Sequence, residues 1–263
     1  MSSTSFNKGI QILLERSLAG FFLAGQTIIH ILQGKIHRRN TGEQMAVVGP
    51  DSLVIALVTA AFVGMVFTIQ VAREFLNFGA VQAVGGVLAL ALSRELAPVL
   101  TAVVLAARVG SAFAAEIGTM KVTEQIDALY VLKSDPIDYL VIPRLLACCA
   151  MLPILTIISL VMGLIGGVFV AELFYGISQS TFIESIKNFL QIWDLVSALI
   201  KAVIFGGVIA IIGCNWGLTT TGGAKGVGES TTTAVVMALI SIFIINFFLS
   251  WVMFQGLGRQ FLN

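Results

Sequence analysis

Residues 116–138 read EIGTMKVTEQIDALYVLKSDPID, and this polar stretch lies between hydrophobic stretches that are each long enough to cross a bilayer. Apolar side chains recur in it at helical spacing, at Val122, Ile126, Leu129 and Tyr130. Polar side chains take the opposite face, at Lys121, Glu124, Gln125 and Asp127. This pattern predicts a short amphipathic helix that Thr123 caps and Asp135-Pro136 ends. An exposed helix between two membrane spans is typical of a docking site for a partner.

The composition indicates an integral membrane protein. Apolar residues make up 57% of the 263 residues and charged residues only 11%, against about 25% in typical soluble domains. The mean hydropathy is +0.98. Because apolar stretches use up nearly the whole chain, no segment is long enough for a soluble catalytic domain. The formal net charge of +1 argues against a nucleic-acid partner.

Five runs with few or no charges reach the length of about 20 residues that a helical span requires. They cover residues 52–72, 80–115, 145–171, 195–217 and 230–258. The predicted fold is therefore an all-α integral membrane protein, a single domain over residues 1–263 with its transmembrane region over residues 52–258. Gly213 and Gly217 stand at GxxxG spacing and are expected to let helices pack closely.

The chain before the first span is predicted to form an amphipathic helix along the membrane interface, over residues 7–39. Its apolar positions recur every three or four residues, at Ile10, Leu13, Leu14, Leu18, Phe21, Gly25, Ile28, Ile29 and Leu32. A cleavable signal peptide is the competing interpretation. The segment is longer than a signal peptide, ends in a basic run and shows no small-residue cleavage site, so we expect it to be retained.

The distribution of basic residues predicts the orientation of the chain. Of the 15 basic residues, three lie on one side of the predicted spans: Arg73, Lys187 and Arg259. Two more, Arg94 and Lys201, lie inside the spans. The other ten of the 15 flank the spans on the opposite side. Since cytoplasmic loops carry the excess of Lys and Arg, the amino terminus and residues 116–138 are expected in the cytoplasm.

Charged side chains inside a span cost about 2.5 to 3.5 kcal/mol each on insertion scales, so they need partners or water. Here they are Arg94, Glu95 and Lys201, and Asn246 adds a polar group to the last span. At ~1.5 Å rise per residue, Glu95, Lys201 and Asn246 fall about 20, 10 and 15 Å in from the outer ends of their spans. These depths permit one cluster, either a structural ion pair of Glu95 with Arg94 or Lys201, or a polar site lining a cavity. Pro98 is expected to kink its helix and help open such a cavity.

The sequence contains no motif for catalysis or metal binding. The glycine-rich loop 217–230 includes Lys225 but lacks the GxxxxGK[ST] pattern of a phosphate-binding loop. It is predicted to be a flexible turn whose end, at Ser230 or Thr231, caps the last span. The two histidines have no carboxylate or cysteine pattern near them in the sequence, so no metal ligand and no catalytic residue is assigned. If ATP is used, another chain hydrolyses it.

Five short motifs resemble the MlaE (YrbE) family of ABC transporter permeases. They are Arg94-Glu-Leu-Ala-Pro-Val-Leu, Ala107-Arg-Val-Gly-Ser-Ala, Ala115-Glu-Ile-Gly-Thr-Met, Thr123-Glu-Gln-Ile-Asp-Ala-Leu and Ile142-Pro-Arg. The resemblance is strongest over residues 93–153, and the family's amphipathic amino-terminal helix and five spans fit most of the chain. It implies a transporter subunit rather than an enzyme.

The resemblance also implies partners. The chain would form a homodimer and bind no cofactor itself, and ATP and Mg would belong to an Mla-type ATPase subunit. Residues 116–138 would insert into that subunit as a coupling helix, through Thr123, Glu124, Gln125, Ile126, Asp127 and Leu129. An MCE-domain, MlaD-like protein would bind on the far side. The cargo would be phospholipid moving between a bacterial inner membrane and an outer membrane, and an organelle inner envelope is the alternative location.

Family permeases use an intramembrane Arg-Glu pair and a Lys of the fourth span near the lipid headgroups. By resemblance these roles fall on Arg94, Glu95 and Lys201. Asn246 stands where a family member has an Asp, so the charge balance near Lys201 differs and an ion pair there becomes doubtful. We expect Arg94, Glu95, Lys201 and Asn246 to line the lipid cavity and its gate.

Two other classes of function stay open. A stand-alone ion-coupled carrier or channel could also use Arg94, Glu95 and Lys201, and transport by the isolated chain in vesicles would support it. A membrane-embedded lipid-modifying enzyme would need a paired His, Cys or acidic motif, which the sequence does not contain. Co-purification of a stoichiometric ATPase subunit would support the permease.

Overall fold

The computed structural model describes residues 3–34 and 37–256, and every regular element in these ranges is helical. Five continuous helical stretches in them are long and apolar enough to cross a membrane: Arg38–Asn77, Val81–Val122, Ile137–Tyr175, Ile192–Leu218 and Gly223–Gln255. The predicted all-α membrane fold with five spans is thereby confirmed. The parts of the predicted segments that fall on residues 35–36 and 257–258 lie outside the described residues.

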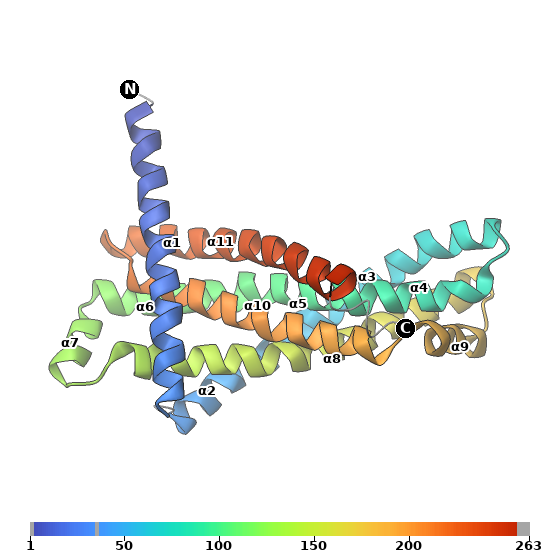
Figure 1. Cartoon of the computed structure of the whole chain (residues 1–263), viewed down its shortest axis with the longest axis horizontal. Helices are drawn as coiled ribbons and strands as arrows, with labels where there is room; N and C mark the ends of the chain where they lie inside the picture. The colour runs from blue at the N-terminus through green and yellow to red at the C-terminus, as the bar shows by residue number, and fades with distance from the viewer. Residues whose placement is uncertain (1–2, 35–36, 257–263) are drawn as a thin grey trace. The chain divides into compact units, whose positions relative to one another are not determined.

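Consecutive helices build these spans (Figure 1). The first joins α2 (Arg38–Val48) to α3 (Pro50–Asn77). The second contains the 3-10 turn η1 (Val81–Ala83), α4 (Val84–Ala91), the π-helix η2 (Leu92–Leu96), α5 (Ala97–Leu105), the π-helix η3 (Ala106–Gly110) and α6 (Ser111–Val122). The third joins the π-helix η4 (Ile137–Val141) to α8 (Ile142–Tyr175). The fourth span is α10 (Ile192–Leu218), and the fifth is α11 (Gly223–Trp251), which the π-helix η5 (Val252–Gly256) extends. Three helices of the described residues lie outside these spans: α1 (Ser3–Leu32), α7 (Gln125–Val131) and α9 (Gln179–Phe189).

The chain divides into two compact units. Unit 1 comprises Met1–Val48, Leu105–Cys148 and Gly206–Ser241, and unit 2 comprises Gly49–Val104, Cys149–Phe205 and Ile242–Asn263. Three boundaries fall inside α8, α10 and α11, so each of these helices contributes one part to each unit. The short helix α7 belongs to unit 1, and α9 belongs to unit 2.

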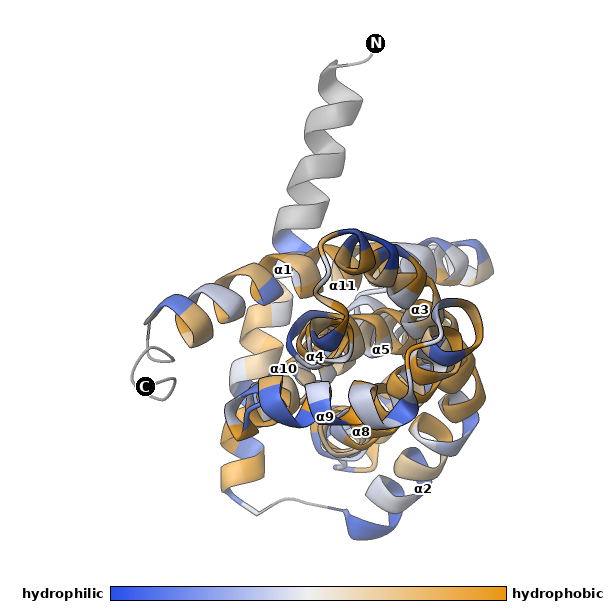
Figure 2. Ribbon diagram, turned by 90° about the vertical axis from the view of Figure 1, so that its right-hand side faces the viewer, coloured by the Kyte–Doolittle hydropathy of each residue, from blue (hydrophilic) through white to orange (hydrophobic). Residues whose placement is uncertain are grey.

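The amino-terminal helix α1 carries an exposed apolar face. Its exposed large hydrophobic side chains are Leu18, Phe21, Phe22, Ile28, Ile29 and Leu32. Leu23 and Thr27 are buried on the other side of the helix. The side chains of Ile10, Leu13 and Leu14, which belong to the predicted stripe, lie outside the described residues. Such an exposed face suits contact with lipid, as do the largely hydrophobic ribbons of the long helices in Figure 2.

In unit 2, α9 packs across two consecutive glycines of α4 (Figure 1). A Cβ atom at Gly85 would lie 2.4 Å from the Phe182 carbonyl oxygen, and one at Gly86 would lie 2.4 Å from the Phe189 ring. The Gly86 N–H also donates to Ser185 Oγ at 2.8 Å. This packing fixes the helix that leads directly into η2.

The helices α3 and α8 cross in unit 2 at small residues. A Cβ atom at Gly64 would lie 2.0 Å from the Gly163 carbonyl oxygen, and one at Gly166 would lie 2.5 Å from the Ala61 carbonyl oxygen. Lipid tails are as apolar as the helices themselves, so association in a membrane depends on such close van der Waals contact. The two backbones can approach this closely only while these positions lack side chains.

In unit 1, the predicted GxxxG pair of α10 packs against the second span. A Cβ atom at Gly213 would lie 2.9 Å from the Gly110 carbonyl oxygen, and one at Gly217 would lie 2.7 Å from Ile117 Cβ. The expectation that these glycines let helices pack closely is confirmed, and the partners found here lie in the same chain.

The predicted cap of the last span is wrong. The helix α11 begins at Gly223, so Ser230 and Thr231 lie inside it, and Thr231 Oγ1 donates to the Gly228 carbonyl oxygen at 2.7 Å. Gly222 and Gly223 have φ angles of +88° and +68°, which reverse the chain within a few residues. The turn therefore needs only a small part of the glycine-rich loop.

The prediction that Thr123 caps the start of the short helix is also wrong. The helix α6 continues through Val122, and Thr123 Oγ1 donates back to the Thr119 carbonyl oxygen at 2.8 Å instead of capping the next helix. Glu124 takes the N-cap position of α7 with a φ angle of +61° and makes no side-chain cap. The chain thus changes direction at Glu124 by a left-handed backbone conformation.

Gly64→Ala is expected to destabilise the protein, because its methyl group would have to displace the α8 backbone at Gly163. The free energy of unfolding should fall by about 2 kcal/mol, as in overpacked cores. Thermal unfolding in detergent micelles measures the change. Gly42→Ala in α2 is the matched control, since an added Cβ there meets no atom within 4 Å. Equal Tm values for Gly64→Ala and the unmodified protein would contradict the close crossing.

Candidate functional site

The candidate site lies in unit 2 and starts from an irregularity in the second span. The π-helix η2 carries Arg94 and Glu95, and Pro98 follows in the first turn of α5. Proline has no N–H to donate to the carbonyl group four residues earlier, which is that of Arg94. Lys201 Nζ of α10 donates to this oxygen at 2.7 Å. The disturbed backbone around Pro98 thus supplies an acceptor for a buried ammonium group, and π-segments often mark functional sites.

Glu95 lies at the centre of a hydrogen-bonded group. Its Oε1 accepts from Lys201 Nζ at 2.9 Å and from Ser250 Oγ at 2.7 Å, and its Oε2 accepts from Asn246 Nδ2 at 2.7 Å. Lys201 Nζ also donates to Ser250 Oγ at 2.8 Å. The Lys201 side chain is fully buried, whereas the Glu95 side chain is 43% exposed. The structure therefore brings together three of the four predicted cavity residues, and Lys201 keeps an ion pair although position 246 is an Asn.

Arg94 binds a different partner from its neighbour Glu95. Its Nε donates to Asp194 Oδ1 at 2.7 Å, and its guanidinium group lies 4.7 Å over the Phe254 ring. The Asp194 side chain is fully buried, and its Oδ2 accepts from the Gln191 N–H at 3.0 Å. The Arg94 side chain stays 32% exposed. An Arg94–Glu95 ion pair, one of the structural alternatives from the sequence, is replaced by this contact.

Two members of the group, Asp194 and Ser250, were not predicted from the sequence. Asp194 directly precedes the predicted span 195–217, whose one charge is Lys201, and so looked like a loop residue. It stands seven residues before Lys201, two helical turns along the same face, and this spacing is the signal that could have identified it. Ser250 gave no such signal, because its partners come from other spans.

The group contains two acids and two bases, and each charge has an opposite charge within 2.9 Å. Its formal charge is therefore zero. Unpaired charges would be costly in a span, and removing one partner of a buried pair leaves the other uncompensated. Asn246 contributes a neutral amide whose Oδ1 is buried and has no hydrogen-bond partner among the described residues. We call the following six residues the charge cluster: Arg94, Glu95, Asp194, Lys201, Asn246 and Ser250.

The short helix α7 of unit 1 lies in the turn between α6 and α8 (Figure 1). Its exposed polar residues and those just before it are Thr123, Glu124, Gln125 and Asp127. Ile126 is buried and Leu129 half-buried, whereas Tyr130, Val131 and Leu132 are 62%, 82% and 73% exposed. Tyr130 was expected on the same face as Ile126, but the end of α7 presents it outward. The segment therefore offers acidic and apolar groups side by side.

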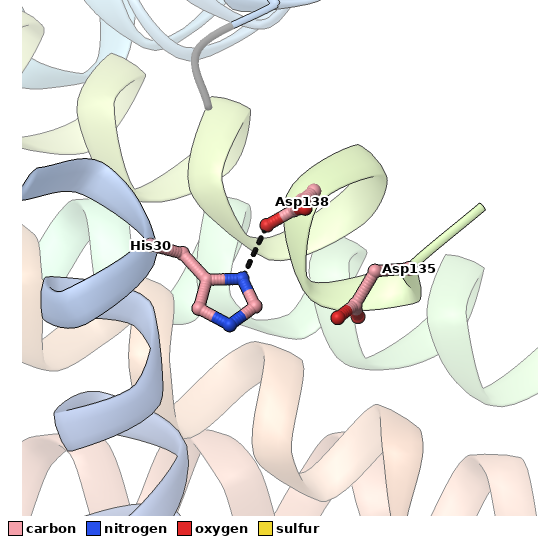
Figure 3. A group of neighbouring side chains, drawn as sticks. All are labelled: His30, Asp135 and Asp138. Atoms are coloured by element: carbon pink, nitrogen blue, oxygen red, sulfur yellow. Dashed lines mark hydrogen bonds and ion pairs between the residues drawn. The ribbon is translucent and has the colours of Figure 1, made fainter. Parts of the chain in front are cut away.

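A further polar contact joins α1 to the start of the third span in unit 1. His30 Nδ1 and Asp138 Oδ1 lie 2.5 Å apart, and the side chains are only 19% and 14% exposed. Asp135 lies beside them (Figure 3). One ring nitrogen of His30 and one carboxylate oxygen each of Asp135 and Asp138 all lie within 4.8 Å of one another. Asp135 Oδ1 accepts from the Ile137 N–H at 2.9 Å, in the turn that leads into η4. The histidine therefore has a carboxylate beside it after all, from a residue 108 positions away that sequence spacing could not reveal.

Similar proteins are known from bacteria and from a chloroplast. The family described as Permease MlaE matches residues 41–252, a range that includes the charge cluster and α7. A probable ABC transporter permease protein of Synechocystis sp. is 64% identical over 258 residues, 98% of each chain. The chloroplastic protein TRIGALACTOSYLDIACYLGLYCEROL 1 of Arabidopsis thaliana is 53% identical over 94% of this chain and 71% of its own. A probable ABC transporter permease protein of Rickettsia typhi is 42% identical over 81% of this chain and 82% of its own.

Lys201→Met should destabilise the protein, because it leaves the Glu95 carboxylate without its cation. We expect the free energy of unfolding to fall by about 3 kcal/mol, as when one partner of a buried ion pair is removed. Glu95→Gln/Lys201→Met should lose less than the two single variants together, since no unpaired charge remains. Chemical unfolding in mixed micelles compares the four proteins. Strictly additive losses would contradict direct coupling of the pair.

Asp138→Asn should loosen the attachment of α1, because the amide forms a weaker contact with His30 than the carboxylate does. Loss of about 1 kcal/mol in a hydrogen bond corresponds to roughly fivefold faster amide exchange in α1. Hydrogen–deuterium exchange with mass spectrometry measures this rate helix by helix. Glu43→Gln is the control, since Glu43 lies exposed on α2 and pairs with Arg39 there. Unchanged exchange in α1 would show that the contact does not hold the helix.

Proposed function

This chain belongs to the MlaE family of ABC transporter permeases, and from that premise we propose that it is the membrane subunit that moves phospholipid between an inner membrane and an outer membrane. The name of the Arabidopsis relative is that of a glycosylated diacylglycerol, which supports lipid rather than an ion as the cargo. The proposed location is a bacterial inner membrane. An organelle envelope is the alternative that the chloroplastic relative favours.

The charge cluster is the observation that carries this proposal. Its residues occupy otherwise apolar spans, where ionised groups are rare and usually mark a pathway or a binding site. The Arg94 Nε is held by Asp194, and we assign the two terminal amino groups of Arg94 to the headgroup phosphate through charge-assisted hydrogen bonds. The Glu95–Lys201 pair would act as the gate beside it. For transport, the affinity of the site for lipid must differ between two conformations of the permease.

A separate ATPase subunit would drive the change between these conformations and would hold the ATP and Mg. Its proposed docking site is α7 with the residues before it. The exposed residues that would contact the ATPase are Thr123, Glu124, Gln125, Asp127, Tyr130, Val131 and Leu132. Ile126 is buried and Leu129 half-buried, so their proposed part is to hold α7 in place. Exposed apolar side chains outside the spans are typical of a protein interface.

A second copy of the chain and an MCE-domain, MlaD-like protein complete the proposed assembly. The unit 2 part of α11 exposes a row of large apolar side chains: Phe243, Ile244, Phe247, Phe248 and Trp251. This face includes the turn next to Asn246, so a partner covering it would enclose the site between two copies. Homodimer interfaces are more apolar than other surfaces, which supports a second copy there. The MCE-domain protein would receive or supply lipid on the far side of the membrane.

Glu124→Lys and Asp127→Lys should each uncouple ATP hydrolysis from lipid movement, because they reverse the charge of the proposed docking surface. We expect at least about a tenfold loss of ATP-dependent lipid transfer, the loss from about 1.4 kcal/mol of docking energy. The assay follows labelled phospholipid between vesicles that contain the permease, its ATPase and the MCE-domain protein. Glu43→Lys, on the exposed surface of α2, is the control and should transfer lipid normally.

Two results would contradict this part of the proposal, one from the same assay and one from the purified chain alone. Full transfer and full ATPase binding in both α7 variants would contradict the docking site. Transport of an ion by the purified chain alone, without ATP or an ATPase, would instead identify a stand-alone carrier or channel.

A further inference from the structure

The charge balance of the charge cluster bears on which headgroup it binds. Arg94 is paired with Asp194, and Glu95 is paired with Lys201. Asn246 completes the surroundings of Glu95 with an amide, where a carboxylate of the same size would have added a negative charge. The cluster is therefore electroneutral only because position 194 is an acid and position 246 is not.

The four charged side chains of the cluster are not equally accessible to a headgroup. The side chains of Asp194 and Lys201 are fully buried, whereas Arg94 and Glu95 are 32% and 43% exposed. The accessible surface of the cluster thus presents one cation and one anion from consecutive residues. Asp194 cannot move away from Arg94 easily, because its other oxygen accepts from the N–H of Gln191, the residue just before α10.

This arrangement favours some headgroups over others. A headgroup with a net negative charge is attracted by Arg94 and Lys201 and repelled by Glu95 and Asp194, so it gains little from a cluster with no net charge. A headgroup with an acceptor and a donor but no net charge gains from both exposed side chains. Zwitterionic phospholipids whose ammonium group carries N–H donors and neutral glycosyl diacylglycerols share this chemistry.

We propose that Asp194 and Asn246 are the specificity-determining residues of this site, which selects lipids whose headgroups carry no net charge and offer both an acceptor and a donor. The inference rests on the proposed function, since it takes the charge cluster as part of the lipid site. Asp194 acts by fixing Arg94 and cancelling its charge. Asn246 acts by being neutral, so that Glu95 is the only carboxylate among the described residues that compensates the charge of Lys201.

Two isosteric substitutions of opposite sign test this inference. Asp194→Asn raises the formal charge of the cluster by one, and Asn246→Asp lowers it by one. The full-length protein is exchanged into nanodiscs with equal parts of phosphatidylethanolamine, phosphatidylglycerol and a monogalactosyl diacylglycerol, and is then extracted gently. Native mass spectrometry counts the lipids that remain bound. The measured quantity is the ratio of anionic to uncharged lipid.

The unmodified protein should retain phosphatidylethanolamine or the galactolipid over phosphatidylglycerol, and the relative amounts of those two show whether the acceptor that binds Arg94 is a phosphate or a sugar hydroxyl. The ratio of anionic to uncharged lipid should rise at least about threefold in Asp194→Asn and fall by a similar factor in Asn246→Asp. Asp194→Asn/Asn246→Asp restores the net charge of zero and should return the ratio to within about twofold of the unmodified protein. Glu43→Gln changes the protein's charge by the same amount on an exposed surface and should have no effect.

The possible results distinguish failure of this inference from failure of the proposed function. A preference of the unmodified protein for phosphatidylglycerol, or a ratio that neither substitution moves, would overturn the inference while leaving lipid transport intact. Retention of no more lipid than a membrane protein without such a cluster would overturn the proposed function itself. If Asp194→Asn does not assemble, Asn246→Asp carries the test alone, and an unchanged ratio in it overturns the inference.

Discussion

A charge inside an apolar span has to find an opposite charge, and this requirement determines how the helices of unit 2 meet. Glu95 of the second span binds Lys201 of the fourth span and Asn246 of the fifth. Arg94, one residue earlier, binds Asp194 at the start of α10. These polar contacts set the register between the helices together with the close glycine contacts, because no hydrophobic driving force brings helices together in lipid.

The irregular backbone of the second span makes this arrangement possible. A regular α-helix would place Arg94 and Glu95 about 100° apart with all nearby carbonyl groups engaged. The π-helix η2 and Pro98 change this, and the Arg94 carbonyl oxygen becomes an acceptor for Lys201. The close packing of α9 on Gly85 and Gly86 fixes the preceding helix, so the irregular turn keeps one position.

Hydropathy and periodicity predict the all-α fold and its five spans because both depend on the environment of single residues. Glu95, Lys201 and Asn246 could be identified in the same way, as polar groups where lipid-facing residues belong. Their partners could not, since a partner depends on the register of helices that are distant in sequence. The contacts of Arg94 with Asp194 and of His30 with Asp138 were missed for this reason, although the spacing of Asp194 from Lys201 marks both as residues of one helix face. The predicted starts of α7 and α11 were wrong for a local reason. Glu124 and Gly223 take left-handed backbone conformations, which side-chain capping rules do not consider.

Stability alone does not account for two ion pairs in these spans. Replacing a buried ion pair by apolar groups of similar size is often neutral or stabilising, so a protein that only needed to pack its helices would lose nothing without them. The proposed lipid site has a different requirement, because it would have to bind a polar headgroup and then release it. Paired charges meet this requirement, since a bound headgroup exchanges one set of polar contacts for another and no charge is left uncompensated in the lipid. An electroneutral cluster can in this way alternate between two states that differ by little free energy, which a single unpaired charge could not do.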